Sequence, residues 1–447
     1  MSLTRIHSAG FRRCLWAAAS VACAAGPAQA GVSLLVVDRT AGKLWRLTDL
    51  DNSNTIEPGE IFVWFDGTNA AGTPAFITPF AFAVRPIDNA VLVGDANSAN
   101  RSLYLIKDAD RSGSAMGMTE SRVVLTGANA SGATITAPSG VAFFPGFDPG
   151  YVNAGAGSNP DAIYRLHEIV ADGTYQDAGE VSPWVTNWAT YGSGNTPFSP
   201  QEIVFDAAGV GYVRNSSSGA PGHSVWRFRD ANGNGRADDP GEMTLWFDNT
   251  NAAGITMGAG FAMELDLARP RTIYTNHLLS LGGGVNRKQI VRLSDSNNDG
   301  NANGPNESVA VYSTDEAGLT IQDVVSLPNG DLYFTDVSSS PGGKRIFRLH
   351  DLGADGLFLD PGERTEFLTQ ATAAAAGILD NRYLGWLRDI SACAADFNNS
   401  GDLSVQDIFD FLNAWFNTDP RADFNNVGGL NVQDIFDFLN AWFAGCA

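Results

Sequence analysis

The chain has 447 residues, of which 44% are hydrophobic and 10% aromatic. This composition supports a large packed core and argues against global disorder. The formal net charge is −21, because 49 acidic side chains outnumber 28 basic ones. Such a surface repels phosphate backbones and anionic lipids, so we expect no binding to nucleic acid or to a membrane surface, and instead an affinity for cations.

The first thirty residues, 1–30, have the pattern of a secretory signal peptide. A basic start precedes an apolar stretch at 15–25, and an A-x-A cleavage sequence occupies 28–30. The apolar stretch is too short to span a bilayer, and no later segment is long and apolar enough to do so. We therefore expect a secreted protein, extracellular or held at the cell surface, with no transmembrane segment. Lipidation of Cys23 is the rival interpretation, although Ser20 stands where a lipobox usually carries an aliphatic residue.

Two of the cysteines, Cys14 and Cys23, leave with the signal peptide. Cys393 and Cys446 remain in a chain bound for an oxidising compartment, and this predicts a disulfide between them. Closing a loop of this size would remove about 4 kcal/mol of unfolded-state entropy in the simple chain model. Two unpaired thiols are the alternative.

Internal repetition is the main feature of residues 31–390. A phrase of alternating apolar and polar residues, the period of a half-buried strand, recurs six times. Each copy is preceded by another short apolar strand that ends at Asp or Asn, and five copies have a further strand upstream. The six phrases begin at Leu44, Leu103, Ile163, Val225, Ile290 and Ile346, and the preceding strands end at Asp38, Asp95, Asn153, Asn215, Asn276 and Asp336.

Four short strands per repeat, separated by turn residues, are typical of a propeller blade. The first copy lacks its opening strand, and the segment that starts at Gly377 can supply it after the sixth copy. Such a closure joins the two ends of the ring and removes exposed sheet edges. The sequence therefore predicts a mainly β fold with a six-bladed β-propeller over residues 31–390.

The strand phrasing resembles six-bladed propellers of the NHL, YWTD and SMP-30/gluconolactonase-like kinds. The SMP-30-like resemblance implies a metal site at the channel, with Glu202 and Asp323 as further carboxylates and His277 as an acid or base. However, the Asp/Asn ring occurs in every copy, and a feature repeated six times indicates turn capping. We therefore expect that the chain is not an enzyme, with an extracellular metal-dependent hydrolase or lactonase as the alternative. Non-equivalent side chains that converge in the channel would favour the enzyme.

The loop after each aromatic-Arg-Leu strand carries oxygen side chains at alternate positions. Calcium binds six to eight oxygen atoms, and a short loop with ligands at positions 1, 3 and 5 plus a distal carboxylate supplies them. Asp and Asn also make ordinary hairpin turns, and both interpretations stay open. The candidate ligands are Asp49, Asp51, Ser53 and Glu60 in copy one; Asp230, Asn232, Asn234 and Glu242 in copy four; and Asp295, Asn297, Asp299 and Glu307 in copy five. Copy two, from Asp108 to Glu120, is also plausible, whereas copy three has lost the pattern.

A different repeat, of 27 residues, fills the segment 391–447. Two polar loops each run into the identical string VQDIFDFLNAWF, at Val405 and Val432. Ile408, Leu412 and Trp415 fall at helical spacing and give the first string one apolar face. A loop with carboxylates at positions 1 and 12 and Gly at position 6, followed by a helix, is half of an EF-hand.

Two such units in tandem resemble a type I dockerin, and the closing Gly445-Cys446 pair resembles its GC-type form. The resemblance implies calcium-dependent folding and docking to a cohesin-like or other cell-surface receptor. Val427 cannot act as a ligand, and the Val-Gln pairs stand where dockerins often carry recognition hydroxyls, so a self-contained helical hairpin is the alternative. The implied calcium ligands of the first loop are the side chains of Asp396, Asn398, Ser400 and Asp407 and the backbone carbonyl of Asp402. Those of the second loop are the side chains of Asp423, Asn425 and Asp434 and the backbone carbonyl of Gly429.

The sequence as a whole favours a secreted, Ca²⁺-binding propeller that acts in extracellular binding or cell-surface attachment. Its small C-terminal dockerin-like domain would provide the attachment, through paired half-EF-hands. The ligand of the propeller is not encoded in a motif that we can name.

Overall fold

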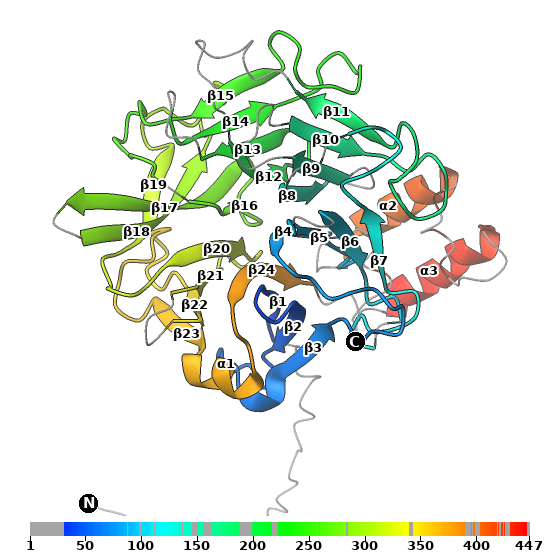
Figure 1. Cartoon of the computed structure of the whole chain (residues 1–447), viewed down its shortest axis with the longest axis horizontal. Helices are drawn as coiled ribbons and strands as arrows, with labels where there is room; N and C mark the ends of the chain where they lie inside the picture. Colours follow the sequence, from blue (N-terminus) through cyan, green and yellow to red (C-terminus); the bar gives the residue numbers. More distant parts are fainter. Residues whose placement is uncertain are drawn as a thin grey trace, which may run out of the picture.

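The computed structural model shows six four-stranded antiparallel sheets around a central axis (Figure 1). It describes residues 31–444 apart from 87, 98–100, 111, 134, 136, 145–149, 155–161, 187–198, 217–221, 259, 283–284, 339–342, 389–394, 396, 398–402, 418, 420–421, 423 and 425–429. The predicted six-bladed propeller is therefore confirmed as the fold of the described β region.

Each blade contributes its first strand to the channel and its fourth to the outside. Blade one is β24 (Asn381–Leu387), β1 (Ser33–Asp38), β2 (Lys43–Thr48) and β3 (Ile61–Phe65). Blade two is β4 (Pro79–Val84), β5 (Val91–Asp95), β6 (Ser102–Ile106) and β7 (Ser121–Leu125). Blade three is β8 (Pro138–Phe143), β9 (Gly150–Ala154), β10 (Ala162–Leu166) and β11 (Val181–Val185).

The second half of the ring repeats this order. Blade four is β12 (Pro200–Phe205), β13 (Gly211–Asn215), β14 (Ser224–Phe228) and β15 (Met243–Phe247). Blade five is β16 (Met263–Leu265), β17 (Thr272–Gly282), β18 (Val285–Ser294) and β19 (Ser308–Thr314). Blade six is β20 (Ile321–Ser326), β21 (Leu332–Asp336), β22 (Arg345–Leu349) and β23 (Arg364–Leu368). A 3-10 turn, η1 (Pro58–Glu60), precedes β3, and helix α1 (Gln370–Ala376) follows β23.

The ring closes as the sequence predicts, because the innermost strand of blade one comes from the far end of the propeller. β24 pairs with β1 in antiparallel register, with Leu384 opposite Val36. The carboxylate of Asp38 accepts hydrogen bonds from the backbone N–H groups of Leu379 at 2.7 Å and Asp380 at 3.1 Å. One buried side chain thus ties the two ends of the ring together.

Hydrophobic clusters fill the spaces between neighbouring sheets. Trp64 and Phe65 of blade one pack with Phe82 and Tyr104 of blade two, and equivalent clusters lie between the other blades. The alternation of each strand sends one set of side chains into each cluster. These clusters fix the sheets relative to one another and so fix the channel between the innermost strands.

Antiparallel order gives the ring two distinct faces. The turns between first and second strands and the loops between third and fourth strands lie at one face, which we call the hairpin face. The loops between second and third strands and the links from blade to blade lie at the other, which we call the connection face. The predicted calcium loops of the blades therefore lie at the hairpin face, and the Asp/Asn ring lies at the connection face.

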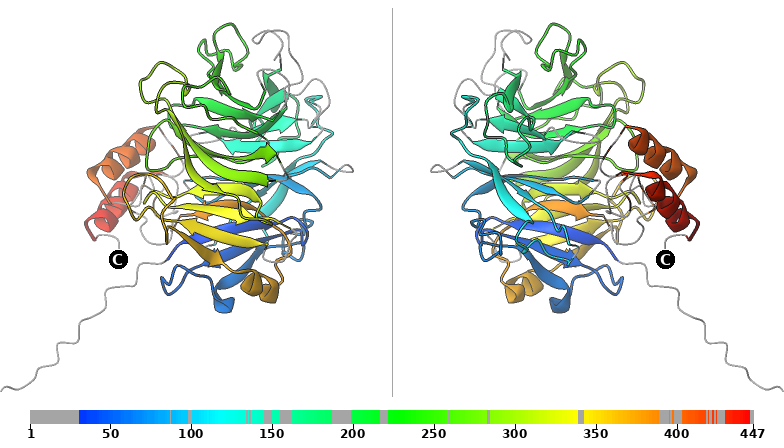
Figure 2. Two further views of the ribbon diagram at one scale, coloured as in Figure 1. Left: turned by 90° about the vertical axis from the view of Figure 1, so that its left-hand side faces the viewer. Right: turned by 90° about the vertical axis from the view of Figure 1, so that its right-hand side faces the viewer.

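The C-terminal region contains the two predicted helices, α2 (Val405–Phe416) and α3 (Val432–Ala444). They lie outside the ring of sheets (Figure 2) and pack through stacked Phe411 and Phe438, whose ring centroids are 4.1 Å apart. The buried carboxylate of Asp407 accepts a hydrogen bond from the backbone N–H of Ser404 at 2.7 Å and caps α2. The buried Asp434 accepts one from Asn431 in the same way. The helices are confirmed, whereas a dockerin fold stays a prediction.

Several other sequence predictions concern residues that the structure leaves out. No helix in the described part of the chain is both long and apolar enough to cross a membrane. The signal peptide at 1–30, both cysteines of the predicted disulfide and most of the implied dockerin ligands lie outside the described residues: Cys393, Cys446, Asp396, Asn398, Ser400, Asp402, Asp423, Asn425 and Gly429.

The closure makes a direct prediction for Asp38. The substitution Asp38→Ala removes a buried acceptor from the backbone N–H groups of residues 379 and 380, and the loss of charged hydrogen bonds costs about 3 kcal/mol of unfolding free energy. Urea denaturation checks this against Asp355→Asn, an exposed change on a blade loop that we expect to be neutral. Equal stability of the two variants would contradict the role given to Asp38.

Candidate metal centre in the propeller channel

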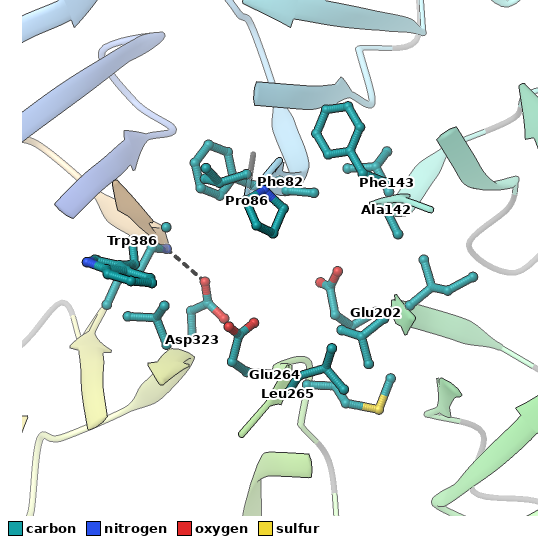
Figure 3. A pocket seen from close by; sticks show the side chains of 18 of the residues that line it. Phe82, Pro86, Ala142, Phe143, Glu202, Glu264, Leu265, Asp323 and Trp386 are labelled. Carbon is teal, nitrogen blue, oxygen red and sulfur yellow. Dashed lines mark hydrogen bonds between the residues drawn. The ribbon is translucent and has the colours of Figure 1, made fainter. Parts of the chain in front are cut away.

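Three carboxylates from three consecutive blades meet in the central channel. Glu202 comes from β12, Glu264 from β16 and Asp323 from β20, and all three line one cavity of about 170 Å³. Figure 3 shows the carboxylates of Asp323 and Glu264 next to each other, with Glu202 facing them across the cavity. All three side chains are half-buried, because the narrow channel leaves one side of each open.

These carboxylates break the symmetry of the repeat. Glu202 and Asp323 are the third residues of equivalent innermost strands. Ala81, Gly140 and Tyr383 hold that position in blades two, three and one. Glu264 is not equivalent to the other two acids. It lies opposite Tyr274 in the register of its blade, whereas Ile203 and Val324 hold the matching positions in blades four and six.

Burial and mutual repulsion disfavour the charged forms of all three groups. Burial raises the pKa of Asp323 to about 7, from an ordinary value of 3.8. The pKa of Glu264 is raised well above its usual range by burial and then by the charge of Asp323. The pKa of Glu202 is likewise raised by burial, by Asp323 and by Glu264. No cationic side chain among the described residues offsets these shifts.

One end of the cavity is apolar. Phe82, Phe143 and Trp386 line it beside the carboxylates, and the lining extends to Pro86 and Leu267 in turns of the hairpin face. Backbone hydrogen bonds hold the side chain of Asp323 in place. Its carboxylate accepts hydrogen bonds from the backbone N–H groups of Leu384 at 2.7 Å and Val324 at 2.9 Å. The cavity therefore has acidic side chains along one wall. Its apolar end lies toward the hairpin face.

The donor set fits a divalent cation. Carboxylate oxygens are the ligands that hard cations such as Ca²⁺, Mg²⁺ and Mn²⁺ prefer. Arg388 also lines this cavity. Three half-buried acids are costly unless they take up protons, pair with such a cationic side chain or gather around a metal ion. Glu202, Glu264 and Asp323 would hold such an ion after a shift of their side chains, because the structure does not bring ligand oxygens of all three within 4.8 Å of one another. The raised pKa values describe the protein without a metal ion, in which protons neutralise the carboxylates.

The symmetric Asp/Asn ring has a different role. Asp95 accepts hydrogen bonds from the backbone N–H groups of Ile77 and Thr78, and the Asn276 side chain bonds four backbone groups in blades five and six. Ring side chains therefore cap turns at the connection face, as their sixfold repetition indicates. The suggestion that His277 acts as an acid or base in the channel is wrong, since this buried residue does not line the cavity.

The predicted calcium loops of the blades differ among themselves. In blade four, the Asn232 and Asn234 side chains donate to Asp239 at 2.7 Å, and in blade five Asn297 donates to Asp299 at 3.0 Å. Within the described chain, two blade loops bring three carboxylate groups within 4.8 Å of one another: Asp49, Asp51 and Glu60 in blade one, and Asp108, Asp110 and Glu120 in blade two.

The distal glutamate of each loop caps the backbone. Glu60 accepts from the N–H of Leu50 at 2.6 Å, and Glu242 and Glu307 bond their own loops in the same way. Glu180 also does so in blade three, where the calcium pattern is lost. This capping directly supports the turn interpretation. Calcium binding stays a prediction, with an observation in its favour in blade five, where Oδ1 of Asp295 is buried without a hydrogen-bond partner.

Comparisons with known proteins support the fold. No protein-family model matches the chain, and no curated protein is similar to it. Among solved structures, the chain is similar to a gluconolactonase from Xanthomonas campestris, with 12% identity, 74% of this chain and 86% of that one covered and a TM-score of 0.40. A provisionally assigned 6-phosphogluconolactonase from Bacteroides uniformis is 12% identical over 80% of this chain and 100% of that one, with a TM-score of 0.43. A nidogen/laminin complex is 14% identical over 71% and 89%, with a TM-score of 0.43.

The prediction that the chain is not an enzyme needs correction. Structures named as gluconolactonases, which are hydrolases, are among those similar to the chain. At such low identity and TM-score the likeness itself shows only a propeller. The channel supplies the chemical argument, because acids from three of the six blades line one cavity there, two of them, Glu202 and Asp323, at equivalent positions.

The unpaired acids predict an unusual dependence of stability on pH. Between pH 4 and the folded pKa of Asp323 at about 7, the unfolded chain has lost a proton that the folded chain still holds. In chelator, the free energy of unfolding should therefore fall as pH rises through this window. Asp323→Asn should reduce the slope and Asp355→Asn should leave it unchanged. Chemical denaturation at several pH values measures it, and a flat profile for the unsubstituted protein would contradict the cluster.

Proposed function

We propose that this protein is an extracellular, metal-dependent hydrolase of small esters or lactones, with its active site in the channel. The convergence of Glu202, Glu264 and Asp323 on one cavity carries this proposal. A divalent cation bound by these groups would polarise an ester carbonyl and make a water molecule more acidic. Structures named as gluconolactonases in the same fold agree with this class of reaction.

The residues of the channel site would have different roles. The three carboxylates would approach the cation from three blades, and they would move closer together as it binds, because their oxygen atoms do not all lie within 4.8 Å of one another. Asp323 is fixed by two backbone N–H groups and sets the position of the site. Phe82, Phe143 and Trp386 exclude water from the apolar end and would contact the carbon skeleton of a substrate. A cavity of about 170 Å³ restricts the substrate to a small molecule.

Lactone hydrolysis tests the proposal. Glu264→Gln and Asp323→Asn should each lower kcat/KM for D-glucono-1,5-lactone or γ-butyrolactone by at least about 100-fold, or roughly 3 kcal/mol of transition-state stabilisation. The assay follows acid release with a pH indicator, in chelator and after addition of Ca²⁺, Mg²⁺ or Mn²⁺. Asp355→Asn is the matched control, because it removes an acidic side chain that lies outside the cavity. Full activity of both channel variants, or of the chelated protein, would contradict the proposal.

A second function belongs to the C-terminal helices, which we propose attach the secreted protein to a cell-surface receptor in a calcium-dependent way. The supporting observation is a matched pair of exposed aromatic surfaces. Phe409 and Phe416 on α2 are 62% and 74% exposed, and their equivalents Phe436 and Phe443 on α3 are 56% and 77% exposed. Exposed aromatic side chains at equivalent positions of both helices favour a partner protein.

Calcium in this region can be tested separately from the channel. The double variant Asp396→Ala/Asp407→Ala removes both carboxylates of the first implied loop, and Asp407 also caps α2. We expect it to lose one calcium-binding event in calorimetry and part of the helical circular dichroism. Asp410→Ala, on α2 beyond the loop, is the control. An unchanged calcium titration and helical signal in the double variant would defeat the assignment.

A further inference from the structure

A second cavity, of about 330 Å³, opens between blades three and four. Blade three contributes Phe144, Tyr151 and Trp184, and blade four contributes Asp230 at the start of a hairpin-face loop. None of these residues lines the channel cavity. The volume lies at the lower end of the range for small-molecule pockets. The space is therefore a candidate binding site separate from the proposed active site.

Two guanidinium groups make this cavity unusual in a chain with a net charge of −21. Arg165 and Arg229 both line it, and neither side chain forms an ion pair or hydrogen bond with any described residue. The Nε atom of Arg165 is buried without a partner. An unsatisfied buried donor costs about 1–3 kcal/mol, and more when it is charged. This Nε atom is out of reach of a ligand. An anionic ligand in the cavity would instead form charge-assisted hydrogen bonds with the accessible ends of the two guanidinium groups.

The other walls limit the shape and polarity of the anion. Tyr151 packs against Trp184 at a ring-centroid distance of 4.7 Å and pairs with Arg165 in the register of β9 and β10, so an apolar aromatic surface lies beside that guanidinium group. Burial raises the pKa of Tyr151 to about 12, while the charge of Arg165 lowers it and that of Asp230 raises it. The phenol therefore stays protonated at neutral pH and close to both charged groups. Its hydroxyl has no hydrogen-bond partner among the described residues.

We propose that this cavity binds a carboxylated sugar, with the carboxylate on Arg165 and Arg229. The sugar hydroxyls would meet the Tyr151 hydroxyl and the remaining acceptor positions of the Asp230 carboxylate, which the backbone N–H groups of its own loop hold in place. The C–H face of the ring would lie against the aromatic surface. A sugar acid combines the anion, the hydroxyl groups and the apolar face that these walls complement. A neutral sugar would leave the guanidinium groups unpaired, and an aromatic acid would leave Asp230 and the phenol unused.

The repeat provides a matched control for the arginines. Arg227 holds the position in the strand phrase of blade four that Arg165 holds in blade three. Its guanidinium lies beside Gly300 of the next blade and does not line the cavity. Arg227→Gln therefore removes the same charge from an equivalent strand without touching the proposed site.

Calorimetric titration of the whole protein with sodium glucuronate, D-glucose and sodium benzoate tests the proposal. Glucuronate should bind saturably and at least ten-fold more tightly than either of the others. Arg165→Gln and Arg229→Gln should each weaken it at least ten-fold, whereas Arg227→Gln should not. Arg229 is exposed, so its replacement leaves the fold intact even if that of Arg165 does not.

Several outcomes would overturn the proposal. They are an absence of saturable glucuronate binding, equal binding of glucose or benzoate, and an Arg227→Gln effect as large as that of Arg229→Gln. Channel variants that lose lactone hydrolysis should still bind glucuronate with unchanged affinity, because the two cavities share no residue.

Discussion

Repulsion among three carboxylates in a narrow channel is the interaction on which this account depends. Glu202, Glu264 and Asp323 lie on neighbouring innermost strands and line one cavity, with Glu202 across it from the other two (Figure 3). Burial raises the cost of ionising all three groups, and the charge of Asp323 adds to that cost for Glu264 and Glu202. Such an arrangement needs either protons or a cation, and at neutral pH a divalent cation is the more effective partner.

The propeller turns a repeated sequence into an asymmetric site. Its capping side chains, such as Asp38, Asp95 and Asn276, repeat around the ring and bind backbone groups. The same is true of the distal glutamates of the blade loops. These repeated acids stabilise the scaffold. The acids that depart from the repeat are free to carry chemistry, and they are confined to one side of the channel.

Much of the fold could be predicted from the sequence, because each blade repeats the same strand phrases. Closure by the segment after Gly377 was predicted because the first copy lacks a strand. Helix α1 was missed, although Thr369 caps its start and Gly377 ends it in a left-handed conformation. Both signals were present, but the segment lies between repeats and matches none of them.

The site was only half predictable. Glu202 and Asp323 were found because both lie beside the predicted innermost strands of their copies. Glu264 was missed because its spacing in the sequence differs from that of Glu202. Glu264 comes two residues before Asp266, whereas Glu202 comes four residues before Asp206. Its approach to the other acids depends on the register of β16 against β17, which a single sequence does not reveal. An enzymatic function was not predicted, because the Asp/Asn ring occurs in every blade and such repetition indicates turn capping.

Crystallographic localisation of a metal ion tests the central claim most directly. Crystals of the protein grown with Mn²⁺ and measured at its absorption edge should show an anomalous peak in the channel, within bonding distance of carboxylate oxygens of Glu202, Glu264 and Asp323. The peak should disappear in Asp323→Asn. Anomalous density confined to the blade loops, with only water between the three acids at neutral pH, would contradict the account.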